Sequence, residues 1–418
     1  MQRRRPRVNL LCCSVALAWA LGAPAEPTAT AAAVKNPLPK LSAAFTERSY
    51  VPGQLASLKL RTDAPTLTLR ILRAGAERAW GSVGKPWGPP LEIRWTARGR
   101  SAALPVRIGA WPSGLYFARL GTRRGDVTYA PFIVRASSPG RVRVAVVLPT
   151  NTWAAYNFWD ENADGTGDTW YADQRRQSVN LQRPFLNNGK PPYYRTNDRG
   201  FLRFLVHRGR QADYLSDEDL DRFESGEQLA QLYDLIVFAG HHEYQTTRSY
   251  DLTERYRDLG GNLAFLSANN FFWRVDLKDR KLWRIKKWRD LGRPEARLIG
   301  VQYRANDDGQ RAAQYVVVNR SAALWLFAGL EIADGSPLGK ARYGIEFDMV
   351  TADSPPGTTV LAEVNPGLVD PSIRGQMTYY ETSAGARVFA AGTLSFGGSD
   401  NPTGETLFTN LWAQLSRP

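Results

Sequence analysis

Cysteine and histidine are both scarce in this chain of 418 residues. The only cysteines are Cys12 and Cys13, inside an apolar run near the N-terminus, and there are three histidines in all. If the N-terminal run is removed on export, no thiol remains, which excludes disulfides, thiolate nucleophiles and zinc–thiolate sites. Beyond that run, no apolar stretch approaches the ~20 residues that a membrane-spanning helix needs.

The N-terminal segment predicts export. Four arginines among the first seven residues precede the apolar run 10–21, and Ala23-Pro24-Ala25 offers a small-residue cleavage site. We therefore expect a signal peptide over residues 1–25 and a periplasmic or extracellular mature chain. Removing these arginines lowers the formal net charge from +14 to +10. The remaining positive charge is scattered, so we expect no nucleic acid partner.

After the signal, residues 26–41 are rich in Ala, Pro and Thr and predict a linker. Residues 42–138 then contain short runs that alternate apolar and polar side chains, as in Leu67-Thr68-Leu69-Arg70-Ile71-Leu72, separated by Gly- and Pro-containing turns. This pattern predicts an immunoglobulin-like β-sandwich. Residues 42–138 lack His, Cys and clustered carboxylates, so a structural or adhesive role is expected for them.

Residues 141–418 have a different pattern, in which apolar strands alternate with helices. Nearly continuous apolar runs indicate strands that are buried on both faces. The order of elements predicts an α/β fold with a doubly wound, mostly parallel sheet. The expected strands cover 142–148, 212–215, 235–240 and 263–267, the expected helices 200–209, 252–259 and 404–415, and a late hairpin pairs 376–380 with 386–391.

Ligands of open α/β sheets bind beyond the carboxyl ends of the strands. Polar segments follow three of the predicted strands, at 149–157, 240–244 and 267–270. His241 and Glu243 come directly after a buried strand, and their spacing places both on one side of the turn. The chain lacks a Gly-x-Ser-x-Gly elbow, so metal-assisted hydrolysis is the favoured chemistry. Carboxylate, phenolate and imidazole ligands suit hard cations, ferric iron among them.

Several segments together resemble a known family. Residues 143–415 resemble the catalytic part of the large (beta) subunit of N,N-dimethylformamidase and its relatives. The resemblance rests on Leu-Pro-Thr-Asn-Thr-Trp-x-Ala-Tyr-Asn (148–157), Thr-Trp-Tyr (169–171), Arg-Pro (183–184), Gly-His-His-Glu-Tyr (240–244) and Gly-Gly-Asn-Leu (260–263), with Asn269 and Trp273.

The resemblance implies a mononuclear iron bound by two tyrosines and one glutamate, in a fold similar to class I glutamine amidotransferases. By position, Tyr156 and Glu243 match two of the ligands, and Tyr171 is the best match for the second tyrosine. Tyr193 and Tyr194 are the alternatives to Tyr171. A phenolate at neutral pH needs a cation, because a free tyrosine titrates near ~10.

The resemblance also implies the groups that move protons and orient the substrate. His241 would transfer protons, Asn269 would orient the substrate through its amide, and Glu381 on the late hairpin is a candidate for a second acid–base group. The chain departs from the characterised enzyme by lacking its extra N-terminal half and by carrying an export signal. Dimethylformamide itself is therefore not the expected substrate.

Residues 160–168 read Asp-x-Asn-x-Asp-Gly-x-x-Asp, close to the first nine positions of an EF-hand loop. The candidate calcium ligands are Asp160, Asn162, Asp164 and Asp168. The closing glutamate of an EF-hand is missing, and an acidic surface turn is the alternative interpretation.

The leading hypothesis is an exported, metal-dependent hydrolase of a non-peptide C–N bond, such as that of a small amide. The alternatives are a non-enzymatic envelope or carbohydrate-binding protein that uses an aromatic cleft, and a homologue that has lost turnover. The expected partner is a small amide substrate, and a homo-oligomer is compatible with the sequence.

Overall fold

A computed structural model describes residues 39–77, 83–307 and 309–417. The predicted signal peptide and nearly all of the predicted linker lie outside these ranges. Within them, no helix combines the length and the apolar character needed to cross a bilayer.

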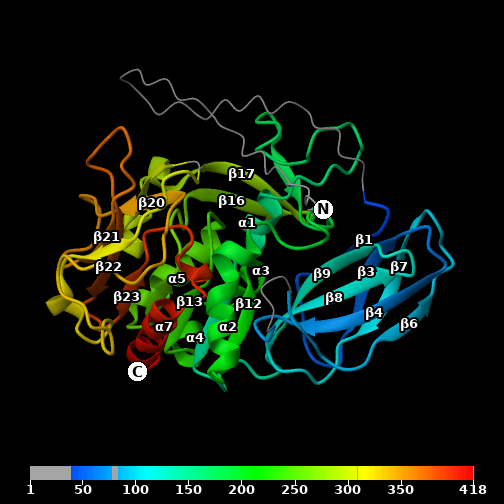
Figure 1. Ribbon diagram of the computed structural model, residues 1–418, viewed down its shortest axis with the longest axis horizontal. Helices are drawn as coiled ribbons and strands as arrows, with labels where there is room; N and C mark the ends of the chain where they lie inside the picture. Colours follow the sequence, from blue (N-terminus) through cyan, green and yellow to red (C-terminus); the bar gives the residue numbers. More distant parts are fainter. Residues whose placement is uncertain (1–38, 78–82, 308, 418) are drawn as a thin grey trace, which may run out of the picture.

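The N-terminal strands form two sheets around one core (Figure 1, blue and cyan). All of their pairings are antiparallel except the short β2–β9 pair. Leu58, Tyr116 and Phe132 are at most 1% exposed at the centre of this core, which explains the alternating sequence pattern. One sheet has the order β1 (Ser42–Phe45), β3 (Leu55–Arg61), β7 (Ser101–Arg107); the other is β2 (Ser49–Tyr50), β9 (Val127–Val134), β8 (Gly114–Thr122), β4 (Thr66–Arg73), β5 (Lys85–Pro86), with β6 (Leu91–Arg94) also on β4.

An eight-stranded mixed sheet organises the rest of the chain, and it confirms the α/β class. The first five strands pair in parallel and the last three are antiparallel. The predicted late hairpin is present as β22 and β23. The order is β12 (Asp213–Ser216), β10 (Val144–Leu148), β13 (Leu235–Phe238), β15 (Asn262–Phe265), β23 (Arg387–Ala390), β22 (Gly375–Glu381), β21 (Thr359–Val364), β19 (Tyr315–Val317).

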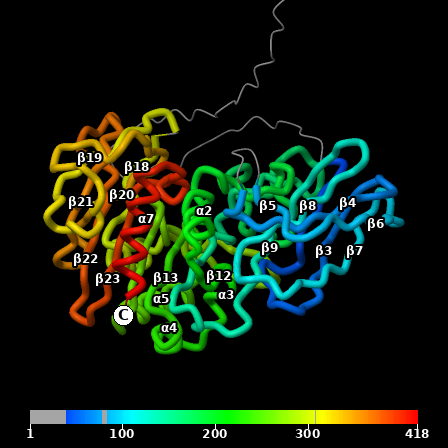
Figure 2. The backbone as a smooth tube through the Cα atoms, turned by 60° about the horizontal axis from the view of Figure 1, so that its bottom comes forward, coloured from blue at the N-terminus to red at the C-terminus, as the bar shows by residue number. Residues whose placement is uncertain are grey.

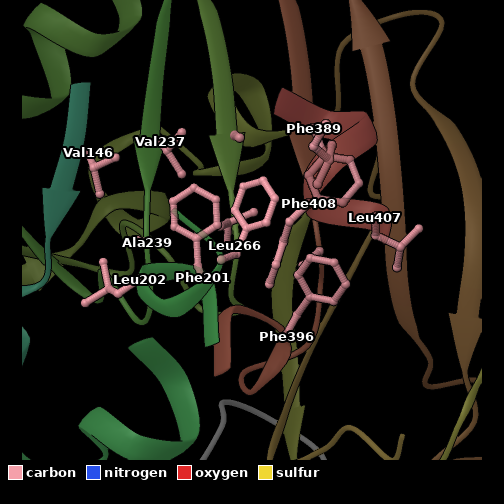
Figure 3. Packing of buried hydrophobic residues seen from close by; sticks show 14 of the residues in the cluster. Val146, Phe201, Leu202, Val237, Ala239, Leu266, Phe389, Phe396, Leu407 and Phe408 are labelled. Atoms are coloured by element: carbon pink, nitrogen blue, oxygen red, sulfur yellow. The ribbon is translucent and has the colours of Figure 1, made fainter. Parts of the chain in front are cut away.

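Helices cover both faces of this sheet, because its central strands are apolar on both sides. Val146 and Val237 face the side of α2 and α7, where they share a core with Phe201 and Phe408 (Figures 2 and 3). Val147 belongs to the core on the opposite face, under α4 and α5. The helices are α1 (Thr150–Ala155), α2 (Arg199–His207), α3 (Asp217–Leu220), α4 (Gly226–Leu232), α5 (Thr247–Asp258), α6 (Ala296–Ile299) and α7 (Pro402–Leu415).

Short elements that the sequence pattern does not indicate surround one edge of the sheet. Strands of two to seven residues form two small sheets, and one segment is a π-helix, an uncommon element that is frequent at functional sites. The sheets are β11 (Ser178–Asn180), β17 (Lys281–Lys287), β16 (Trp273–Lys278), β14 (Tyr244–Gln245), and β18 (Gln302–Asn306) with β20 (Glu346–Met349). The π-helix is η1 (Tyr194–Asp198), and the 3-10 helices are η2 (Trp288–Leu291), η3 (Arg320–Ala323) and η4 (Phe396–Gly398).

Candidate active site

The loops after β10, β13 and β15 meet at the carboxyl edge of the parallel strands. The backbone N–H of Glu243 donates to Thr152 Oγ at 3.0 Å, which joins the second loop to α1. The backbone N–H of His242 donates to Asn270 Oδ1 at 3.1 Å, which joins the second loop to the third. All four residues are buried. The loops are therefore held together by hydrogen bonds before any ligand binds.

The structure brings Tyr156, Tyr171 and Glu243 together. Tyr156 ends α1, and its ring stacks on that of Tyr171 with 4.4 Å between centroids. The Tyr171 hydroxyl donates to Glu243 Oε2 at 3.1 Å and lies 2.6 Å from the hydroxyl of Tyr244. Two phenols from the segment between α1 and β11 thus converge with one carboxylate from the loop after β13, and a third phenol lies beside them.

His241 lies against the same carboxylate. Its Nδ1 is 3.0 Å from the carbonyl oxygen of Ala268, and its Nε2 is 3.2 Å from Glu243 Oε2. Although these atoms are close, Nε2 makes no well-directed hydrogen bond to a described residue. Burial lowers the pKa of His241, but the carboxylates of Glu346 and Glu243 outweigh it and raise the pKa from 6.5 to about 9. The geometry therefore favours a charged imidazole.

Glu346 is the acidic residue at this site that the sequence analysis missed. It begins β20, its carboxylate lies 3.6 Å from His241 Nε2, and its Oε2 has no hydrogen-bond partner among the described residues. Burial raises the pKa of Glu346 to about 7, against the opposing effect of His241. Its only sequence signal is the acid–apolar–acid order of Glu346, Phe347 and Asp348, which places both acids on one side of a strand.

Asn269 lies next to these acids. Its backbone N–H donates to both carboxylate oxygens of Asp348, at 2.9 and 3.0 Å. Its φ of 52° is in the left-handed region, and its buried side-chain Oδ1 has no partner among the described residues. A buried acceptor held in this way is available to a ligand, as expected for an orienting amide.

The structure does not bring Glu381 to this group, so its assignment as the second acid–base residue is wrong on topological grounds. Glu381 ends β22 and pairs with Arg387, the first residue of β23. Because β23 runs parallel to β15, its first residue lies at the amino edge of the sheet, opposite the three loops. Glu381 is exposed there and accepts a hydrogen bond from the Tyr379 hydroxyl.

The alternative tyrosines differ in position. Tyr193 is 58% exposed and its ring lies edge-on to Tyr156, with 5.8 Å between centroids. Tyr194 is buried in the core and lies edge-on to Phe117. Of the three candidates for the second phenol, Tyr171 is the one whose hydroxyl contacts Glu243.

The chemistry of these donors fits a hard cation. Burial, with the nearby charge of Glu243, raises the pKa of Tyr156 and Tyr171 well above 10, so their phenolates need a positive partner. In the described ranges, no group of three or more His, Cys, Asp or Glu side chains is arranged to bind a metal on its own. A cation at this site would therefore depend on the phenols.

The candidate calcium loop forms a compact turn. Asp160, Asn162 and Asp164 accept hydrogen bonds from backbone N–H groups of the loop itself, among them Gly165 N–H to Asp160 Oδ2 at 2.8 Å. The fourth candidate, Asp168, is occupied, because it pairs with Arg176 and accepts the N–H of Glu161. Calcium binding stays a prediction.

Comparison with known proteins identifies relatives of the same family. The chain is 24% identical to the N,N-dimethylformamidase beta subunit of Paracoccus aminophilus and 23% identical to that of Alcaligenes sp. Each alignment covers 58% of this chain but only 38% of the relative. Among solved structures, a superoxide reductase (neelaredoxin) variant, E23A, from Ignicoccus hospitalis matches 23% of this chain and 79% of its own at 8% identity, with a TM-score of 0.16 that supports no conclusion. Residues 81–401, by contrast, match a family along most of the chain, which therefore belongs to the N,N-dimethylformamidase beta subunit-like, C-terminal family.

Proposed function

We propose that this chain is an exported, metal-dependent amide hydrolase that acts on a small amide. The observation that carries the proposal is the convergence of Tyr156, Tyr171 and Glu243 beside His241. Membership of a family that includes N,N-dimethylformamidase subunits supports amide hydrolysis as the reaction class. The chain matches well under half the length of those subunits, so activity, substrate and any partner subunit are part of the proposal.

The proposed metal is a single iron, bound by Tyr156, Tyr171 and Glu243. Bound there, it would supply Lewis-acid activation of a carbonyl group or a water molecule. The protein's own part is to hold these donors at the carboxyl edge of the sheet and to move protons beside them. In this proposal, His241 Nε2 is the proton-transfer atom, because it lies next to Glu243 while Nδ1 is held by Ala268.

Glu346 takes the second acid–base role in place of Glu381. Its carboxyl lies within reach of His241 Nε2, and its pKa of about 7 suits a group that gains and loses a proton near neutrality. Asn269 is the proposed substrate-orienting amide, with its unpartnered oxygen at the same edge.

The finer fold assignments are also proposals. Two sheets around one core over residues 42–138 support an immunoglobulin-like sandwich, and helices on both faces of a mixed sheet support a glutamine amidotransferase-like arrangement over residues 141–418. The arginine-rich start and apolar run support export.

Metal content after substitution of Glu243 tests the proposal. In Glu243→Gln, the bound iron measured by elemental analysis should fall at least tenfold, while circular dichroism stays that of the wild type. The matched control is Glu381→Gln, an exposed glutamate at the far edge of the sheet, which should keep its iron. Unchanged iron in Glu243→Gln would remove Glu243 from the ligands.

Colour provides an independent test. Iron bound by tyrosinate absorbs visible light through charge transfer, so the purified wild-type chain should be coloured, and Tyr171→Phe should shift or weaken the band. A colourless, iron-free preparation from iron-replete cells would favour the carbohydrate- or envelope-binding alternative.

A further inference from the structure

The candidate active site contains a third phenol, Tyr244, which the proposed function leaves without a role. Tyr244 follows Glu243 directly in the chain, begins β14 and is 0% exposed. Its hydroxyl oxygen lies 2.6 Å from that of Tyr171, which in turn lies 3.4 and 3.1 Å from the two carboxylate oxygens of Glu243. The hydroxyl of Tyr171 is therefore shared between the carboxylate and the third phenol.

The available protons decide which phenol donates in this contact. A carboxylate only accepts hydrogen bonds, so the single hydroxyl proton of Tyr171 goes to Glu243, and the oxygen of Tyr171 accepts from Tyr244. A Tyr171 phenolate has no proton, and Tyr244 must again be the donor. Tyr244 thus donates to Tyr171 in both states, and the hydrogen bond becomes stronger when its acceptor is charged.

The hydroxyl of Tyr244 is held in place by the rest of the protein. The Tyr244 backbone pairs with Trp273 between β14 and β16, and its carbonyl oxygen accepts a hydrogen bond from Asn151 Nδ2 at 3.2 Å. Its ring packs against that of Trp170, with 5.2 Å between centroids and 32° between planes. The guanidinium of Arg284 lies over both tryptophan rings, 5.4 Å from the centroid of Trp170 and 4.7 Å from that of Trp273. Because these contacts come from the protein alone, the donor is in position before any ligand binds.

We propose that Tyr244 is a positioning residue that donates a hydrogen bond to the Tyr171 phenolate and thereby tunes the proposed metal site. The inference rests on the proposed function and deepens it by naming the residue that controls one of the proposed ligands. The hydrogen bond orients the phenolate oxygen and withdraws electron density from it, so that an iron bound there would be a stronger Lewis acid. Removing the hydrogen-bond partner of a metal ligand typically costs about 10–100-fold in metal affinity.

The variant Tyr244→Phe tests the inference, because it removes one hydroxyl group and keeps the ring. With ferric iron added in excess to the full chain, the variant should still bind the metal and be coloured. Its charge-transfer band should lie at longer wavelength than that of the wild type, since the phenolate electrons lose a stabilising hydrogen bond. In competition with citrate, its affinity for ferric iron should fall by about tenfold.

Tyr380→Phe is the matched control. Tyr380 is 2% exposed, belongs to the core under α4 and α5, and its hydroxyl donates to the carbonyl oxygen of Leu298. The control also removes a buried hydroxyl, so its melting temperature should fall as that of Tyr244→Phe does, while its band and its affinity for ferric iron stay those of the wild type. A purely structural role of Tyr244 would lower the melting temperature of both variants and move the band of neither.

The outcomes separate this inference from the proposed function. A band that stays in place in Tyr244→Phe, or that moves equally in Tyr380→Phe, would overturn the inference even if the chain hydrolyses amides. Loss of iron from Tyr244→Phe in excess metal, as large as that expected of Glu243→Gln, would make Tyr244 a ligand and would overturn it too. If the chain hydrolyses no amide but the band shifts as expected, the reaction class is wrong and the role of Tyr244 stands. A wild-type chain that binds no added ferric iron would overturn both the inference and the proposed metal.

Discussion

At the scale of single residues, the space around the candidate site depends on Gly240. This residue follows β13, its φ is +83°, and a methyl group there would come within 1.9 Å of Asp198 Oδ1 and 3.4 Å of the Pro149 ring. Only glycine adopts this backbone conformation at little cost while leaving room for a buried carboxyl. The first residue of the Gly-His-His-Glu-Tyr segment therefore acts through conformation and space rather than through chemistry.

Substituting Gly240 by alanine should destabilise the protein by about 2–4 kcal/mol, because a steric clash adds to the strain of a positive φ. The measurement is the free energy of unfolding in urea. Gly385→Ala is the matched control, since its φ is +89° but nothing lies within 4 Å of the added methyl group. The control substitution should lower the free energy of unfolding by only about 1 kcal/mol. Equal losses in the two variants would show that Asp198 does not restrict position 240.

Asp221, a residue outside the candidate site, should make the stability of the protein depend on pH. Its Oδ1 accepts a hydrogen bond from Thr246, the residue that caps α5, at 2.7 Å. Burial raises the pKa of Asp221 from 3.8 to about 6. Because the folded pKa is the higher one, the protonated form favours folding; this contribution is complete below pH 3.8 and is lost as the pH rises through 6.

The variant Asp221→Asn removes this titration. Between pH 4 and pH 8, the stability of the wild type should fall relative to that of the variant by on the order of 1–3 kcal/mol. Urea titrations of both proteins at several pH values measure the difference. A difference that stays constant with pH would mean that Asp221 keeps its ordinary pKa in the folded chain.

At the scale of elements, the π-helix η1 is positioned by the 3-10 helix η4. A methyl group on Gly398 would lie 1.8 Å from the backbone oxygen of Thr196, and one on Gly397 would lie 2.6 Å from that of Asn197. Two consecutive glycines thus allow one backbone to approach another closely. The positions of Asn197 and Asp198, the last two residues of η1, depend on this contact.

Gly398→Ala should therefore push η1 away from η4 and lower the melting temperature by several degrees, because the clash is with backbone that cannot rotate aside. Gly121→Ala is the control: it also lies outside the positive-φ region, and its nearest neighbour is the flexible end of Arg119 at 3.3 Å. The control should melt within about 1–2 °C of the wild type. A similar result for Gly398→Ala would show that η1 tolerates displacement.

Elements with a strong pattern were predictable, and those without one were not. The apolar runs that became β10, β13 and β15 gave both the strands and the edge at which His241 and Glu243 lie. Glu346 was missed because β20 is a four-residue strand in a two-stranded sheet, with no periodic pattern around it. Glu381 was misplaced because the alternating pattern of a hairpin does not indicate at which edge of the sheet the hairpin turn lies. The edge is set by the parallel pairing of β23 with β15, which the sequence pattern does not show.

At the scale of the whole molecule, the N-terminal sheets and the α/β sheet are joined by charged contacts. Arg199, at the start of α2, binds Glu77 at 3.0 Å with both side chains at most 3% exposed. A second pair, Arg280 with Glu47, lies at the surface, with side chains 53% and 32% exposed. The family match begins at residue 81, between β4 and β5 in the sequence, and runs on through the α/β part. We therefore expect the two parts to unfold together.

The two ion pairs allow that expectation to be tested with matched variants. Glu77→Ala removes one carboxylate from the buried guanidinium of Arg199, which still pairs with Asp400, and should lower the free energy of unfolding by about 3 kcal/mol. Glu47→Ala breaks a contact across the same junction but at the surface, where water screens the charges, and should cost less than about 1 kcal/mol. Each variant should still unfold in a single transition when urea unfolding is monitored by circular dichroism. Two separate transitions in Glu77→Ala would mean that the buried pair is what couples the parts. Equal small losses would mean that the apolar residues of the N-terminal sheets that belong to the core of the α/β part, among them Leu72, Phe117 and Ile133, suffice without it.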